Sequence, residues 1–98
     1  MKININSVHF KTDKKLDFFI TEKLEKLSTF YDGLISGEVI LKLDNSDAHN
    51  NKIAEIRLNV RGNDLFAKKH SKSFEEAIDA AIEALRRQLK KHKEKYRI

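Results

Sequence analysis

The sequence has 98 residues and contains no cysteine and no proline. Without cysteine the chain can form neither disulfides nor thiolate metal sites, which fits the reducing cytoplasm as its expected location. No apolar run approaches the length of a membrane-spanning helix, so we expect no membrane partner and no export signal. The absence of proline, repeats and low-complexity segments leaves no domain boundary, so we expect a single domain over residues 1–98.

What the chain does contain is an excess of positive charge, +5 in total, and this excess lies at one end. Residues 1–85 are nearly neutral, with 13 Lys and Arg against 14 Asp and Glu. Residues 86–98 carry seven Lys and Arg against a single acid, Glu94. A neutral domain with one concentrated basic end has a docking surface for a polyanion.

Alternating apolar and polar residues predict four strands, each apolar on one face only. The strands are expected over residues 2–8, 38–43, 54–61 and 65–72. A turn at residues 62–64 (GND) joins the last two strands into a hairpin. One apolar face per strand predicts a sheet that is wet on one side and covered by helices on the other.

Two helices complete a β-α-β-β-β-α order and an α+β fold class. The first is capped by Thr12 or Asp13 and runs to about Ser28, with Phe30 and Tyr31 closing its end. The second begins with a capping box formed by Ser73 and Glu76. Its expected apolar seam consists of Phe74, Ile78, Ala81, Ile82, Leu85, Leu89 and Tyr96, with His92 toward the same side.

The second half of this final helix is the strongest candidate for a binding surface. At about 100° per residue its cations form two neighbouring stripes. The stripes are Arg86, Lys90, Lys93 and Arg97, and beside them Arg87, Lys91 and Lys95. Rows of cations spaced one turn apart match successive phosphates of a folded RNA, and Arg adds bidentate geometry. The alternative is a solvated face whose charges complement the helix macrodipole.

Two further sets of cations allow two interpretations each. Lys23 and Lys26 lie on one side of the first helix, where they either contact RNA or pair with neighbouring acids. Lys68 and Lys72 share a face of the fourth strand, where charge that prevents edge-to-edge aggregation is the favoured interpretation.

Catalytic and cofactor sites find no support in the residue pattern. The four histidines are scattered and form no metal-ligand pair, so each is interpreted as a surface or edge residue. Three glycines provide no phosphate-cradling loop. We therefore expect no enzyme activity, no cofactor, no metal and no small-molecule substrate.

Three segments together resemble a known family, the ribosome hibernation-promoting factors and ribosome-associated inhibitors. Residues 73–79 (SFEEAID) and 85–91 (LRRQLKK) resemble the family pattern in the last helix. Residues 23–27 (KLEKL) resemble the corresponding part of its first helix. The resemblance covers essentially the whole chain and implies a fold similar to double-stranded-RNA-binding domains.

The resemblance also implies a function in translation regulation and stress response. Such a protein binds ribosomal RNA of the small ribosomal subunit in the channel between head and body, where it overlaps the messenger and transfer RNA positions. The expected rRNA-binding residues are Lys23, Lys26, Arg86, Arg87, Lys90, Lys91 and Lys93. A further basic position of the family appears here as Glu83 or Ala84, and Arg86 is expected to compensate.

Resemblance to the short members of the family implies that no C-terminal dimerisation domain follows. The expected partners are then small-subunit rRNA and a separate ribosome-dimerising factor, with a monomer off the ribosome. Two alternatives stay open: a generic RNA-binding module, including a true double-stranded-RNA binder, and a homodimeric interaction module. Glu75 and Glu76 at the start of the last helix disfavour the duplex binder, because they would repel phosphate.

Overall fold

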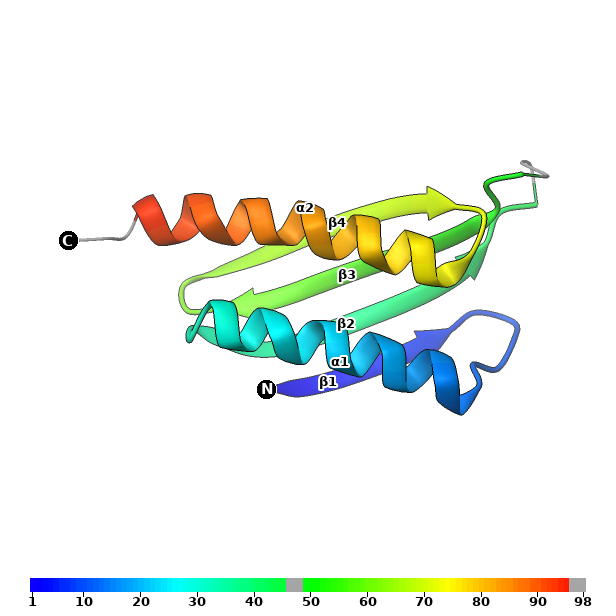
Figure 1. The fold of residues 1–98 in the computed structure, drawn as a ribbon, viewed down its shortest axis with the longest axis horizontal. Coiled ribbons are helices and arrows are strands. Elements are labelled where there is room, and N and C mark those ends of the chain that lie inside the picture. Colours follow the sequence, from blue (N-terminus) through cyan, green and yellow to red (C-terminus); the bar gives the residue numbers. More distant parts are fainter. Residues whose placement is uncertain (46–48, 96–98) are drawn as a thin grey trace.

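The computed structural model describes residues 1–45 and 49–95 and contains a four-stranded sheet and two helices (Figure 1). In chain order the elements are β1 (Lys2–Ser7), α1 (Lys14–Phe30), β2 (Leu34–Leu43), β3 (Lys52–Val60), β4 (Asn63–Ser71) and α2 (Phe74–Lys95). The strands lie in sequence order across the sheet, with β1 parallel to β2 and the other neighbours antiparallel. The predicted element order and the α+β fold class are confirmed.

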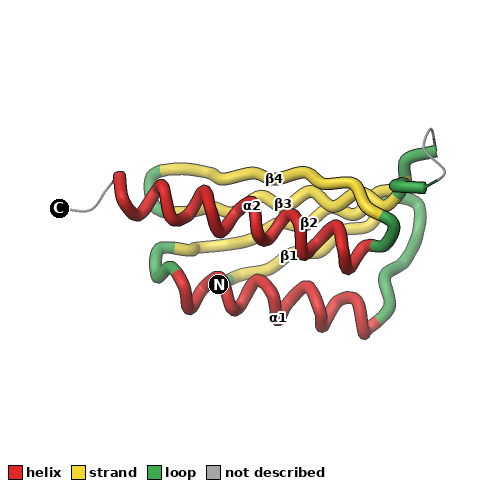
Figure 2. The backbone as a smooth tube through the Cα atoms, turned by 45° about the horizontal axis from the view of Figure 1, so that its top comes forward, coloured by secondary structure: helices red, strands yellow, loops and turns green. Residues whose placement is uncertain are grey.

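Both helices lie side by side over one face of the sheet and leave the other face open (Figures 1 and 2). The alternation in β3 explains this arrangement, because Ile56 and Leu58 are buried whereas Arg57 and Asn59 are exposed. The buried side chains of β2 and β3 form one core with those of the two helices, including Leu24 of α1. The prediction of a sheet that is wet on one side is confirmed.

Helix α1 begins at the cap that its sequence offers. Asp13 is the N-cap, and its Oδ1 accepts a hydrogen bond from the Leu16 N–H at 2.7 Å. Thr12, the other candidate, instead donates to the Asp17 carboxylate at 2.6 Å. The helix ends at Phe30, two residues beyond the predicted end.

Helix α2 begins with half of the predicted capping box. The Ser73 hydroxyl accepts a hydrogen bond from the Glu76 N–H at 3.1 Å, as expected, whereas the Glu76 carboxylate accepts from the Ser71 hydroxyl at 3.2 Å. The apolar seam packs on the sheet, with Leu85 and Leu89 fully buried, while Tyr96 lies outside the described residues. Within the described residues neither helix is long and apolar enough to cross a bilayer.

Several predicted strand boundaries are wrong by one to four residues, and two of the differences have a local reason. Strand β2 begins four residues earlier, at Leu34, because a bulge between Leu34 and Ser36 interrupts the alternation that the prediction relied on. The β3–β4 turn contains only Arg61 and Gly62, and Asn63 already pairs with Val60. Gly62 has φ +80°, the left-handed conformation that favours glycine and permits so short a turn.

We predict that Leu85→Ala lowers the free energy of unfolding by about 2–5 kcal/mol, because it leaves a cavity where a fully buried side chain joins α2 to the sheet. Urea denaturation measures the loss. Leu43→Ala is the matched control, since Leu43 is 44% exposed and the loss there should stay below about 1 kcal/mol. Equal losses at the two sites would contradict the packing described here.

Candidate nucleic-acid interface

Two contacts of α2, one on each flank of the helix, show how the helix is rotated about its own axis. On one flank the Gln88 Nε2 donates a hydrogen bond to the Phe66 carbonyl oxygen of β4 at 3.0 Å. On the other flank Asp79 pairs with Lys23 of α1 at 3.2 Å. Between these flanks the buried seam faces the sheet, so the remaining surface of the helix faces solvent.

This rotation directs the predicted cations away from the sheet. All five cations between residues 86 and 93 have exposed side chains, namely Arg86, Arg87, Lys90, Lys91 and Lys93. The two remaining members of the predicted stripes add nothing, because Arg97 lies outside the described residues and the Lys95 side chain is not described. One ion pair partly neutralises this set in the described part of the chain, Arg87 with Glu83 at 3.6 Å.

A groove runs between the end of α1 and the last turns of α2, and we call it the α1–α2 groove. Its volume is about 890 Å³. It is lined by Phe30, Tyr31, Arg86, Arg87, Lys90, Lys93 and Glu94. The last turn of α2 extends past the β3–β4 turn at one end of the molecule (Figures 1 and 2). Four of the seven predicted rRNA-binding residues therefore share one concave surface.

Aromatic rings form the apolar floor of the α1–α2 groove. The Arg86 guanidinium carbon lies 5.4 Å from the centre of the Phe30 ring, and the Lys93 Nζ lies 5.7 Å from the same centre. Both distances are within cation–π range, so these side chains are held near the ring. The aromatic floor gives the basic groove a second kind of binding chemistry.

The interpretation of every histidine as a surface or edge residue is wrong for His92. His92 is only 7% exposed, and its ring packs edge-on against Tyr31, with 5.6 Å between the ring centres. Its place on the seam side of α2 was expected, but its burial depends on Tyr31 at the end of α1. The contact ties the overhanging end of α2 to α1.

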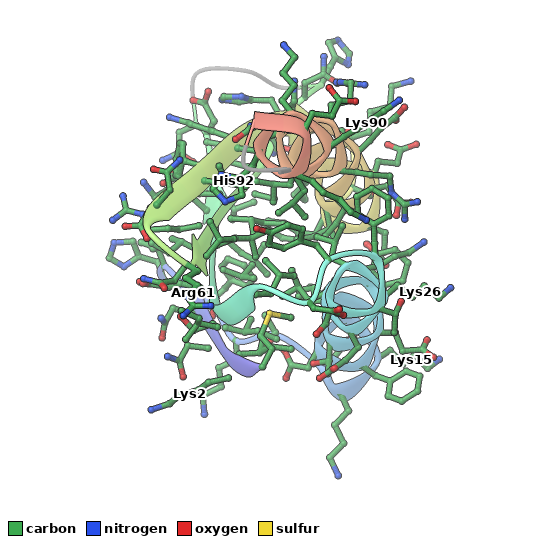
Figure 3. The ribbon with its side chains drawn as sticks, turned by 90° about the vertical axis from the view of Figure 1, so that its left-hand side faces the viewer. Lys2, Lys15, Lys26, Arg61, Lys90 and His92 are labelled. Atoms are coloured by element: carbon green, nitrogen blue, oxygen red, sulfur yellow. The ribbon has the colours of Figure 1, made fainter. Side chains whose placement is uncertain are left out.

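The predicted cations of α1 occupy two different environments. Lys23 is half-buried between the helices, where it pairs with Asp79 and lies 5.3 Å from the centre of the Phe19 ring. Lys26 is exposed and lies on the same side of the molecule as Lys90 (Figure 3). Lys26 therefore extends the basic surface of α2, whereas Lys23 mainly joins the two helices.

The open face of the sheet differs from the helix side, because its positive and negative charges lie close to one another across the strands. Lys42 pairs with Glu55 at 2.7 Å, and Glu38 lies directly opposite Arg57. The Arg57 guanidinium carbon also lies 5.8 Å from the centre of the Phe66 ring. Unmatched positive charge is therefore concentrated on the helix side of the molecule.

Sequence reasoning missed three residues at this end of the molecule. Phe30 and Tyr31 were assigned only to the end of the first helix, and Arg61 only to a strand. The structure brings Phe30 and Tyr31 to the groove and places Arg61 in an adjoining depression that Lys93 also lines. The adjacent aromatic pair was a visible signal, but nothing local to it pointed to a basic helix more than 50 residues later.

The structure also shows whether side chains that could bind a metal ion lie close together. Among residues 1–45 and 49–95 no three His, Asp or Glu side chains are grouped so that they could hold a metal ion. His9, His49 and His70 are exposed. The arrangement of charges, in contrast, suits the binding of a polyanion.

Fold and surface together define a class of protein: a small α+β domain that offers a basic helix end to a polyanion. The chain belongs to the family described as sigma 54 modulation protein / S30EA ribosomal protein, whose model matches residues 3–97. The family resemblance inferred from the two helices is thereby confirmed.

Relatives support this assignment, and solved structures share the fold. The chain is 32% identical over 95 residues to a ribosome hibernation promoting factor of Pseudomonas putida, covering 97% of the chain and 89% of the relative. It is 30% identical over 95 residues to that of Escherichia coli K12, covering 97% and 96%. A ribosomal subunit interface protein from Coxiella burnetii has the same fold, with a TM-score of 0.85 at 19% identity over 95% of this chain and 98% of that one. The Protein Y N-terminal domain of Thermus thermophilus also shares the fold, with a TM-score of 0.81 at 24% identity over 94% and 99%.

We predict that Asp79→Asn strengthens polyanion binding, because it releases Lys23 from its ion pair and removes a negative charge about two turns before Arg86 on α2. The variant should elute from a heparin column at a higher salt concentration than the wild type. Glu55→Gln makes the same change in net charge on the open sheet face and frees Lys42 there. An equal shift in both variants would show that net charge alone controls retention.

Proposed function

We propose that this protein binds the small ribosomal subunit through the basic end of α2 and blocks the messenger and transfer RNA channel. Occupied ribosomes could not translate and would be preserved while idle. The protein would act by occupancy without chemical turnover, as a single domain in the cytoplasm, together with a separate ribosome-dimerising factor.

The observation that carries the proposal is the gathering of exposed cations on one side of a ribosomal-family domain. Arg86, Arg87, Lys90 and Lys93 line one groove, and Lys26 lies on the same side of the molecule (Figure 3). Relatives at 30–32% identity over nearly the full chain are named ribosome hibernation promoting factors. The basic surface and these names support the same function independently.

Phosphate chemistry gives these cations distinct roles. Arg86 and Arg87 can each hold a phosphate in bidentate geometry, whereas Lys90, Lys91 and Lys93 act as point charges. Contacts of this kind fix position and orientation and carry little sequence information. We therefore expect the shape of the RNA channel to contribute most of the specificity.

The homodimeric alternative receives less support from the packing. A dimer formed through the apolar seam of α2 would need that seam exposed, but Leu85 and Leu89 are fully buried against the sheet. The duplex-binding alternative is weakened by Glu75 and Glu76, whose side chains are exposed at the start of α2. Ribosomal RNA bound at the other end of the same helix avoids both objections.

We predict that Arg87→Glu combined with Lys91→Glu abolishes inhibition of translation while the domain stays folded. Both side chains are exposed and lie off the buried seam, so the stability loss should stay within about 1 kcal/mol. Two phosphate contacts become two repulsions, so binding should fall much further. Cell-free translation measures inhibition, and co-sedimentation with purified small subunits measures binding.

Lys2→Glu combined with Lys68→Glu is the matched control for this double variant. It changes the net charge by the same amount but places the new acids on exposed positions of β1 and β4. This control should still inhibit translation. If the α2 variant inhibits as well as the control does, the basic end of α2 is only a solvated face.

We also predict that subunit binding weakens linearly in a plot of log affinity against log salt, because bound cations displace counterions from RNA. Lys90→Gln should make the slope shallower by about 0.7–0.9, the range for one phosphate contact on single- and double-stranded nucleic acid. Sedimentation at a series of potassium chloride concentrations gives the slope. A slope near zero for the wild type would exclude an electrostatic mechanism.

A further inference from the structure

The α1–α2 groove contains more than phosphate binding requires. Phosphates need cations, and those of α2 suffice for that purpose. The groove also has an aromatic floor, where the half-buried Phe30 ring lies 5.4 Å from the Arg86 guanidinium carbon and 5.7 Å from the Lys93 Nζ. Tyr31 adjoins this ring and is braced by the buried His92.

This combination of groups matches the chemistry of an unpaired nucleotide. Unpaired bases stack on aromatic rings and on the planar guanidinium of Arg, while their phosphates bind Lys and Arg. A paired base offers no free face to such a floor, because its neighbours in the duplex already stack on it. The groove volume of about 890 Å³ lies within the usual range for small-ligand sites, about 300–1,000 Å³.

Charge along the groove gives the nucleotide a direction. Arg86 and Arg87 lie near the middle of α2, Lys90 lies one turn before Glu94, and Glu94 lies in the last turn. A phosphate beside Glu94 would be repelled, and one beside Lys90 would be attracted. The flanking phosphates therefore belong on the Arg87 and Lys90 side of the aromatic floor.

We propose that the α1–α2 groove binds one unpaired nucleotide of RNA, with its base stacked on the Phe30 ring beside Arg86 and its flanking phosphates held by Arg87 and Lys90. This inference rests on the proposed function, since it names the form of RNA that the same basic surface recognises. Beyond the phosphate contacts of the proposed function, the protein would also recognise an unstacked base.

The test uses two blunt-ended RNA duplexes that share one strand and differ in the other only by the nucleotide opposite the probe base. One duplex carries a single bulged 2-aminopurine, and in the other this base is paired. Wild-type protein should bind the bulged duplex more tightly, by roughly 5- to 150-fold for one stacked base. Binding should also quench the fluorescence of the bulged 2-aminopurine, because the base stacks on Phe30.

Phe30→Leu keeps an apolar side chain but removes the ring. It should lose most of the preference for the bulged duplex over the paired duplex, which is a ratio measured within one protein. Phe30→Tyr restores a ring and should restore the preference. Phe18→Leu is the matched control, since Phe18 is a 65% exposed aromatic of α1 outside the groove, and it should behave as wild type.

Three results would overturn the inference. The first is equal binding of both duplexes by wild-type protein without quenching, which needs no variant and so does not depend on whether one folds. The second is an unchanged preference in folded Phe30→Leu. The third is poly-glutamate bound as tightly as the bulged duplex and weakened by Phe30→Leu, which would assign the groove to an acidic peptide.

Co-sedimentation with small ribosomal subunits separates this inference from the proposed function. If only the inference fails, wild-type protein and Phe30→Leu bind subunits equally well, and both lose binding at high salt. If the proposed function fails, wild-type protein binds no subunits at any salt concentration, and the inference fails with it.

Discussion

The packing of the α2 seam on the sheet is the interaction on which the rest of the structure depends. Leu85 and Leu89 are fully buried there, and together they fix the rotation and height of the helix over β3 and β4. Once that rotation is fixed, the residues on the side of the helix opposite the buried seam must face solvent. The direction of Arg87 and Lys91 is thus a consequence of hydrophobic burial on the opposite side of the helix.

The distribution of charge gives this small domain two different sides. On the open sheet face, neighbouring strands place acids near bases, as in the Lys42–Glu55 ion pair and in Glu38, which lies directly opposite Arg57. On the helix side the last turns of α2 extend beyond the sheet (Figure 1), and residues 86–93 carry five exposed cations. An approaching polyanion is therefore attracted to one side and oriented before any close contact forms.

The aromatic pair at the end of α1 connects stability to binding. Tyr31 packs against the buried His92 and supports the end of α2, while Phe30 carries Arg86 and Lys93 over its ring. Side chains held in this way lose less conformational entropy when a ligand arrives than free lysines and arginines would lose. The same two rings thus stabilise the overhanging helix and preorganise its cations.

Sequence periodicity by itself determined the element order, the wet and dry faces of the sheet, and the two cationic stripes of α2, because each depends on local spacing along one element. The bulge near Ser36 and the two-residue turn at Gly62 escaped it, since both depend on pairing between strands. The tertiary structure alone decided that Lys23 pairs with Asp79, that His92 is buried, and that Phe30 forms the floor of a basic groove. These contacts join residues far apart in the chain, and only the packing of both helices on one sheet brings them together.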